Sequence, residues 1–424
     1  MAKTDLKQKE HSGLSGANSG KQKNLIPIDL AVERALRLAK PLPQTQVIAL
    51  EKSNARVLAQ SIISRFDQPP FDNSAMDGYG IRLSELKGEA PWVLDICATI
   101  VAGEEINDLP EKGALRIFTG ALVPSEIDAV IMQEHVSLQD NKITIHQLPK
   151  KGANIRRKGE DISSSQTLLE AGELMTPARM ALVASCGLYE IKVQRKVKVA
   201  FFSTGSELRQ PDEQLAPAQI YNSNRFLLAG LLNQPMVDLI DLGSVPDDAD
   251  KLAKTLKQAS EIADIVISSG GILIDQQENY HGLQKELKAD LQVLKLAMRP
   301  AKPMLIGKIN NCVYIGLPGN PMAAHVTFNM IAKPIIEKHA GLKMSKQLSI
   351  CAISSFDKAR RPFRHEYLPV IITGKSDDGA LLLQMLGKGG SAEILPMANA
   401  DGLAVIEPGD GYVSAGDRVQ FIPL

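Results

Sequence analysis

Three short turns in the second half of the sequence combine glycine with hydroxyl or amide side chains, which suits binding of phosphate or another oxyanion. In Leu317–Pro321, Gly319 lets the backbone approach a ligand, Asn320 suits a helix N-cap and Pro321 suits the first helical position. A helix N-terminus offers an anion free N–H groups and the positive end of its dipole. A stiff strand-to-helix connection without a ligand is the alternative, and five residues alone do not decide between them.

Each of the three turns follows an apolar run typical of a buried strand, over residues 196–202, 262–268 and 312–316. In a parallel α/β sheet, the carboxyl ends of the strands line one crevice in which ligands bind. We therefore predict one substrate site at these strand ends. Its residues are Ser203, Thr204, Gly205, Ser269, Gly270, Gly271, Pro318, Gly319, Asn320 and Pro321.

Helical spacing of apolar residues predicts a helix over residues 28–40 and a second helical piece over roughly 51–65. A third helix is predicted over 175–187, because Thr176 suits its N-cap and Pro177 its first position. These helices precede the alternating part of the chain.

Two polar loops in the first half carry carboxylates. The loop 68–79 is rich in helix-breaking residues and contains Asp72 and Asp77. The segment 154–161 places three cations beside two carboxylates, one of them Asp161. Carboxylates are common in loops without any function, so each segment alone is explained by a solvated surface.

The remaining pattern predicts a mixed α/β multidomain protein. Short β runs between residues 92 and 148 predict a small β domain, in which Thr119 and Gly120 follow one strand. Residues 196–341 alternate strands and helices, which implies a parallel sheet. The strands after about residue 348 predict a C-terminal β barrel or sandwich.

Composition excludes several classes of protein. Lys+Arg and Asp+Glu both number 48, and aromatic residues make up only 4%, which argues against nucleic-acid binding. The four cysteines never form a CxxC pair, so we expect a reducing cytoplasm rather than disulfides or zinc. No apolar run approaches the length of a membrane span, and residues 1–24 are polar, as in a disordered tail.

Several short stretches taken together resemble the molybdopterin molybdenumtransferases, the MoeA family that includes the E domain of gephyrin. The likeness extends from about residue 28 to the C-terminus. It is carried, in this order, by DNSAMDGY (72–79), TGALVP (119–124), NIRRKGEDI (154–162), FSTGSEL (202–208), IYNSNR (220–225), SSGG (268–271), LAMRPAKP (296–303) and LPGNP (317–321).

The resemblance implies an elongated homodimer whose subunits have four domains. The tail would comprise residues 1–24. The domains would be a helical linker domain (25–66 plus 150–192), an inserted β domain (67–149), a molybdopterin-binding α/β domain (193–342) and a C-terminal β barrel (343–424).

The resemblance also implies a function in molybdenum cofactor biosynthesis. Such a cytoplasmic enzyme takes adenylylated molybdopterin, releases AMP and inserts molybdate with the help of Mg²⁺; the molybdopterin adenylyltransferase is a candidate partner. Family position makes Asp77, Asp161, Glu207 and Lys302 candidate catalytic residues and adds Thr119, Gly120 and Asn224 to the substrate site; it places Arg299, Lys302, Arg364 and Ser391 around molybdate and makes Asp161, Glu207 and Glu278 candidate Mg²⁺ ligands.

The chain departs from the family pattern at three places. Ser206 replaces an aspartate, Ala301 replaces a glycine, and residues 272–280 are bulkier than usual, with Leu273 and Asp275 among them. A narrower pocket there would fit a weakened paralogue that binds molybdopterin or a protein without efficient turnover. A third alternative is an adenylyltransferase, against which the additional β domains argue.

Overall fold

The computed structural model describes residues 25–105, 108–270, 277–300, 303–344 and 348–424. The predicted tail 1–24, Gly271, residues 272–276, Ala301 and Lys302 lie outside the described residues. The chain forms two compact units. The first unit contains the described residues up to Gln46, together with Ala55–Val57 and Gln194–Leu424, and the second contains Val47–Asn54 and Leu58–Val193.

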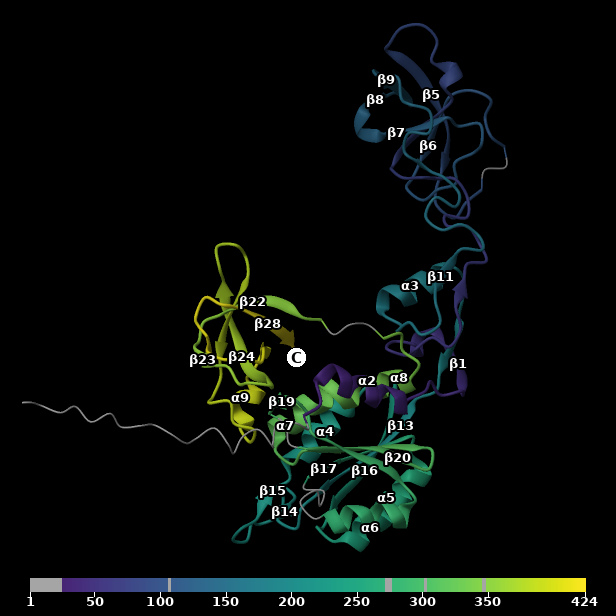
Figure 1. Cartoon of the computed structure of the whole chain (residues 1–424). Helices are drawn as coiled ribbons and strands as arrows, with labels where there is room; N and C mark the ends of the chain where they lie inside the picture. The colour runs from purple at the N-terminus through teal and green to yellow at the C-terminus, as the bar shows by residue number, and fades with distance from the viewer. Residues whose placement is uncertain (1–24, 106–107, 271–276, 301–302, 345–347) are drawn as a thin grey trace, which may run out of the picture. The chain divides into compact units, whose positions relative to one another are not determined.

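The first unit is built on a six-stranded sheet with the order β16-β13-β17-β21-β20-β18 (Figure 1). The first four strands are parallel, as the alternating pattern predicts. Strand β20 is antiparallel to β21, because a tight turn at Asn310–Asn311 joins the two and reverses the chain, and β18 is in turn antiparallel to β20. The bounds are β13 Val197–Thr204, β16 Val237–Val245, β17 Ile265–Ser269, β18 Asp290–Leu294, β20 Met304–Ile309 and β21 Cys312–Leu317.

Helices cover both faces of this sheet. Figure 1 shows α5 (Ala249–Ile262) and α6 (Gln277–Leu287) together on one face. Leu252, Leu256 and Tyr314 are buried in the core on that face. Other helices of the unit are α2 Ile28–Leu38, α4 Ser223–Leu232, α7 Pro321–Thr327 and α8 Lys333–His339, with a π-helical turn at Phe328–Ala332 between the last two.

A second six-stranded sheet of this unit closes into a barrel, because β24 pairs with both β25 and β26. Its core includes Val370, Leu383 and Phe421. The strands are β19 Met298–Arg299, β22 Ile350–Ser354, β24 His365–Lys375, β25 Leu381–Met385, β26 Gly402–Ile406 and β28 Arg418–Pro423, with helix α9 at Ile394–Ala398. The C-terminal β prediction is thus confirmed, and β19 joins this sheet from the loop that follows β18.

A two-fold hydrogen-bonded ion pair anchors the beginning of the parallel sheet. Both guanidinium nitrogens of Arg195 lie 2.7 Å from the carboxylate oxygens of Asp264, which also accepts from the Lys198 N–H at 2.8 Å. Burial raises the pKa of Asp264, but the bonds from Arg195 and Lys198 outweigh it and leave this pKa below its ordinary value. The ionised carboxylate therefore stabilises the fold.

We expect Asp264→Asn to lower the free energy of unfolding by about 2 kcal/mol at neutral pH, because it removes the only ionic partner that the described residues give the largely buried Arg195 guanidinium. A depressed folded pKa contributes stability above the unfolded pKa of about 3.9 and loses it as pH falls through the folded value. Urea unfolding of both proteins should therefore converge in acid. The exposed Asp212→Asn in the turn after β14 is the control, with a change within about 0.5 kcal/mol; an equal effect in both variants would contradict the prediction.

The second unit contains a six-stranded β sheet with the order β7-β4-β6-β5-β9-β8. Its bounds are β4 Gly78–Ile81, β5 Trp92–Ile100, β6 Ala114–Ile117, β7 Ala129–Met132, β8 Val136–Gln139 and β9 Lys142–Ile145. The sequence did not predict β4, which follows directly from the loop at Asp77. A Cβ at Gly78 would lie 2.0 Å from the Ile131 carbonyl oxygen, so β4 and β7 can approach each other only with glycine at this position. In the sequence, by contrast, a glycine here indicates a turn.

The predicted helix over 51–65 is wrong. Only Leu50–Lys52 form a single helical turn, and Ala55 takes a φ of 55°. Ile62–Ile63 then form β2, which pairs with β11 (Thr167–Leu169). The apolar residues reach their core from short extended pieces, so their helical spacing is coincidental.

The helix predicted over 175–187 is confirmed as α3 (Pro177–Ser185), whose N-cap Thr176 accepts from the Arg179 N–H. The remaining short strands are β1 Thr45–Ala49, β3 Asn73–Ser74, β10 Ile155–Arg156, β12 Glu190–Gln194, β14 Leu208–Arg209, β15 Ile220–Tyr221, β23 Lys358–Ala359 and β27 Tyr412–Val413.

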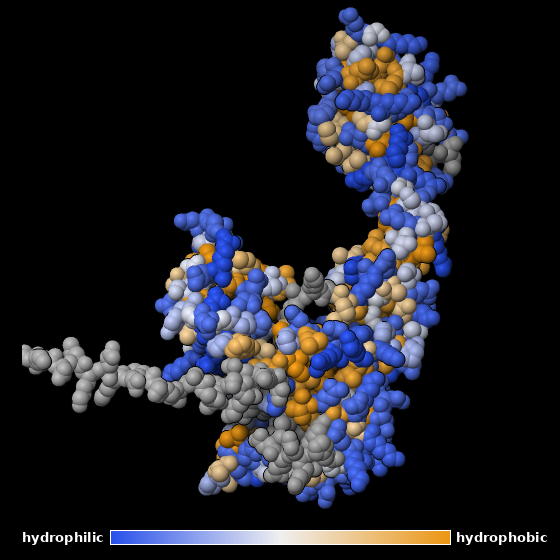
Figure 2. Space-filling view, viewed as in Figure 1, coloured by the Kyte–Doolittle hydropathy of each residue, from blue (hydrophilic) through white to orange (hydrophobic). Residues whose placement is uncertain are grey.

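Figure 2 shows hydrophilic residues over much of the visible face, with apolar residues exposed between them. The cores themselves consist of buried apolar side chains. Among the described residues, no helix combines the length and apolar character that crossing a membrane requires.

Candidate active site

The carboxyl ends of three parallel strands lie side by side, as the sequence predicts. Ser203 of β13 is in register with Ser269 of β17, and Ser269 is in register with Leu317 of β21. The hydroxyl oxygens of Ser203 and Ser269 are 3.3 Å apart, and both residues are buried. The three predicted turns therefore begin at one edge of the sheet.

Two buried polar atoms at this edge have no hydrogen-bond partner within the described part of the chain. They are Oγ1 of Thr204 and Oδ1 of Asn224. The Asn224 amide nitrogen donates to the Gly319 carbonyl at 2.7 Å, which leaves its oxygen available. Buried polar groups are normally paired, so these two atoms are ready to bind a ligand with hydrogen-bonding groups.

Gly270 packs closely against Thr204 at this edge of the sheet. Its φ is +135°, and a Cβ there would lie 2.2 Å from Thr204 Oγ1 and 2.3 Å from the Thr204 carbonyl oxygen. Only glycine therefore lets β13 and β17 end next to each other in this way. Gly205 is also buried in the same edge.

The turn 317–321 leads into α7, with Asn320 as N-cap and Pro321 in the first turn. The predicted cap is only partly correct, because the Asn320 side chain makes no capping bond. Its amide nitrogen instead donates to Ser391 Oγ at 2.7 Å. This bond ties the turn, which includes the buried Pro318, to the segment before α9, so it joins two predicted site residues 71 positions apart in sequence.

Two of the predicted cationic residues, Arg299 and Arg364, lie where β19 pairs with β24 in the barrel sheet. Arg299 of β19 is in register with Glu366 of β24, and its Nη1 lies 3.2 Å from Glu366 Oε1. Arg364 is exposed directly before β24. Helix α9 contacts both β24 and α7, which brings this junction and the strand-end turns into one region of the unit.

The turn after β13 places Glu207 at the surface. Next to it, the Ser206 N–H donates to Asp247 Oδ2 at 3.3 Å, and the Asp247 N–H donates to Ser206 Oγ at 3.2 Å. Ser206 stands where the family pattern has an aspartate, and the Asp247 carboxylate contacts this turn instead. From the sequence, Asp247 is predicted only to cap the following helix with Asp248, and it is not among the candidate site residues.

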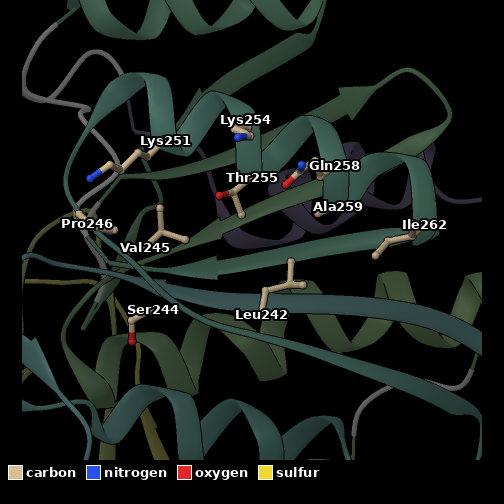
Figure 3. A pocket seen from close by; sticks show the side chains of 10 residues that line it. All are labelled: Leu242, Ser244, Val245, Pro246, Lys251, Lys254, Thr255, Gln258, Ala259 and Ile262. Atoms are coloured by element: carbon tan, nitrogen blue, oxygen red, sulfur yellow. The ribbon is translucent and has the colours of Figure 1, made fainter.

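A pocket of about 460 Å³ lies beside this edge, between α5 and β16 (Figure 3). Its wall contains Leu242, Val245 and Ile262, together with Thr255 and Gln258. None of the predicted site residues lines it. We assign it no role in the chemistry.

In the second unit, Asp77 and Thr119 meet as a pair. Asp77 Oδ1 accepts the Thr119 N–H and the Thr119 hydroxyl, both at 2.8 Å. The bond from the Thr119 N–H makes the largest contribution to lowering the pKa of Asp77, and the bond from the Thr119 hydroxyl lowers this pKa further. Gly120, with a φ of +85°, donates its N–H to the Ser74 carbonyl and completes the turn.

The charged segment 154–161 is held to the loop at Asp72. Asp72 accepts from the Lys158 N–H at 2.8 Å and from Arg157 Nη1 at 2.5 Å, and these bonds lower its pKa against the effect of burial. Asp161 is exposed, and its N–H donates to the Gln68 carbonyl. The segment is thus a defined structure rather than only a solvated loop.

Among the described residues, no three His, Cys, Asp or Glu side chains lie close enough together to hold a metal ion. Glu278 lies in α6, while Gly271 and Lys302 lie outside the described residues. Mg²⁺ is commonly held by one or two carboxylates plus substrate phosphates and waters, so the exposed Glu207 is compatible with it.

Three family models match the chain. They are the MoeA N-terminal region (domain I and II) over residues 26–187, a "probable molybdopterin binding domain" over 200–338, and the MoeA C-terminal region (domain IV) over 352–424.

Curated proteins similar to the chain carry one name. A molybdopterin molybdenumtransferase of Haemophilus influenzae is 36% identical over 407 residues, covering 94% of this chain and 99% of that protein. One from Nostoc sp. is 34% identical over 390 residues, covering 90% and 89%. The crystal structure of a molybdopterin biosynthesis MoeA protein from Pyrococcus horikoshii OT3 matches with a TM-score of 0.81 and 25% identity, covering 95% of this chain and all of that one.

Proposed function

The chain belongs to the MoeA family of molybdopterin molybdenumtransferases, and we propose that it inserts molybdate into adenylylated molybdopterin with release of AMP during molybdenum cofactor biosynthesis. The observation that carries this proposal is the strand-end edge of the parallel sheet. There, Thr204 Oγ1 and Asn224 Oδ1, which have no hydrogen-bond partner among the described residues, lie near a turn that is hydrogen-bonded to Ser391.

The strand-end residues would bind the pterin and the phosphates of the substrate. A pterin presents several donors and acceptors on one edge, which buried hydroxyl and amide groups can satisfy. The proposed substrate-binding residues are those named at the three turns, with Asn224, Thr119 and Gly120.

The cations at the barrel junction would receive molybdate. Molybdate is a dianion, and guanidinium and ammonium groups with a hydroxyl can replace part of its hydration shell. Arg299, Arg364 and Ser391 are the described members of this group, and Lys302 joins them by its position in the family motif. The Asn320 bond would keep the Ser391 hydroxyl oriented.

The carboxylates would support cleavage of the adenylate. Asp77 is held by Thr119, and Glu207 is exposed after β13, so both remain available to the reacting phosphates. We propose Glu207, with Asp161 and Glu278, as ligands for Mg²⁺, which when bound neutralises charge that develops on phosphate oxygens.

We further propose a cytoplasmic homodimer in which both subunits contribute to each site, with the molybdopterin adenylyltransferase as a partner that supplies the substrate. The four domain ranges and the tail 1–24 given by the family likeness are part of this proposal.

The test is a reaction of the purified protein with adenylylated molybdopterin, molybdate and MgCl₂, followed by AMP release and by reconstitution of an apo-molybdoenzyme. We expect both products, and we expect EDTA to suppress AMP release. Substrate binding without AMP release would instead favour a binding protein with weakened turnover, for which the bulky residues 272–280 provide a reason. Formation of adenylylated molybdopterin and pyrophosphate from ATP and free molybdopterin would favour an adenylyltransferase.

A further inference from the structure

A fully buried carboxylate in the barrel contacts two arginines. Glu366 is only 1% exposed, and its Oε1 lies 3.2 Å from Arg299 Nη1 and 3.4 Å from Arg361 Nε. Its Oε2 has no hydrogen-bond partner among the residues that the structure describes. A buried carboxylate is costly unless paired, so this glutamate holds the two guanidinium groups as neighbours.

We infer that Arg361 is a further anion-binding residue of the molybdate site and that Glu366 is the positioning residue that aligns it with Arg299. The inference rests on the proposed function, because it names the same dianion as the ligand. Arg361 and Glu366 both lie outside the eight sequence stretches that resemble the family.

The geometry leaves both guanidinium groups able to bind an anion. Each arginine has five N–H donors, and each contact to Glu366 involves one nitrogen. The side chain of Arg299 is 34% exposed and that of Arg361 is 53% exposed. Two guanidiniums around one carboxylate keep a net positive charge, which favours a second anion on their exposed side.

Positioning by Glu366 would lower the cost of binding. A long arginine side chain on a loop loses rotamer freedom when it binds a ligand, which costs binding free energy. An ion pair that already orders the side chain in the free protein removes part of this cost. The strand register positions Arg299, because this residue lies directly opposite Glu366 on the neighbouring strand. Arg361 comes from the loop before β24.

The adjacent arginine provides a matched control. Arg360 donates from Nη1 to the Glu407 carbonyl at 3.3 Å and from Nε to the Tyr412 carbonyl at 3.5 Å. It has the same charge and lies one residue away, but it contacts another part of the barrel. Any general effect of removing one positive charge should appear equally in both positions.

The experiment measures the dissociation constant for sodium molybdate by equilibrium dialysis of the full-length protein, a readout that does not need turnover. We expect Arg361→Ala to raise this constant about tenfold or more, while Arg360→Ala changes it less than about twofold. Equal effects at the two positions, or no effect at Arg361, would overturn the inference. Wild-type protein that binds no molybdate would defeat the proposed function as well, which separates the two failures.

Glu366 is tested by coupling. Glu366→Gln keeps the shape of the side chain but removes the charge that pairs with Arg361. In this background, Arg361→Ala should therefore raise the dissociation constant for molybdate less than about threefold. A thermal melt shows whether each variant is folded, and Arg361→Lys should recover part of the affinity because it restores the charge. A full tenfold loss that persists in the Glu366→Gln background would show that Glu366 does not position Arg361.

Discussion

Replacing Gly270 by alanine should lower the rate of AMP release by at least about a hundredfold, because misplacing a site by about 1 Å can cost that much. The added methyl would meet Thr204 at 2.2 Å from Oγ1 and 2.3 Å from the carbonyl oxygen. The carbonyl belongs to the backbone and cannot rotate away, so the end of β13 must move. The measurement is AMP release with adenylylated molybdopterin under saturating molybdate.

The control for this change is Gly282→Ala in α6. Among the described residues outside the backbone of α6, no atom lies within 4 Å of the added Cβ, and alanine favours a helix by about 1 kcal/mol over glycine. Its rate should stay within about twofold of wild type. An active, normally folded Gly270→Ala protein would show that the strand-end edge does not bind the reacting group.

A second variant at this edge separates binding from folding. Thr204→Val keeps the shape of the side chain but removes the buried hydroxyl that has no partner among the described residues. Removing such a group should stabilise the ligand-free protein, by up to about 1 kcal/mol, while weakening substrate binding about tenfold. Lower stability with unchanged binding would mean that the hydroxyl serves the fold alone.

The local pattern of the sequence predicts the parts of this protein that depend on neighbours in the chain. Continuous apolar runs mark β13, β17 and β21 because these strands are covered on both faces, and the turns after them follow directly. It cannot predict β4, because Gly78 is selected by the approach of Ile131 from another strand. A local helical spacing likewise misled the prediction over 51–65, where the tertiary core decides.

The site shows the same division. The candidates at the turns and in the loop around Arg299 are visible as motifs, and the structure brings those at the strand ends together. Glu366 and the bond between Asn320 and Ser391 depend on residues about 70 positions apart, for which one sequence contains no signal. Ser206 appears as a departure in sequence, whereas only the fold reveals Asp247 beside it.

Asp77→Asn should lower the rate of AMP release by at least about tenfold. Asparagine keeps an oxygen that can accept both bonds from Thr119, so the turn should retain its shape while losing one negative charge. Because those bonds lower the pKa of Asp77, the wild-type carboxylate stays ionised above the ordinary value of about 3.9. Its charge should therefore be present throughout the neutral range of a rate profile.

The control for Asp77 is Asp140→Asn, in the exposed turn between β8 and β9 of the same sheet. It removes the same charge from the same unit, so a general electrostatic effect would appear in both. We expect its rate to stay within about twofold of wild type. Equal rates for wild type and Asp77→Asn would remove Asp77 from the reaction.

Mixing of subunits then tests whether a site draws on two chains. Asp77 and Lys302 belong to different predicted domains, and the proposed homodimer combines loops from both subunits in each site. If so, inactive Asp77→Asn and Lys302→Ala proteins should partly rescue each other after subunit exchange, because a mixed dimer contains one site with both native residues. Light scattering should show a dimer before and after mixing. A fully active monomer, or a mixed dimer without any recovered AMP release, would place both residues in a site formed by a single chain.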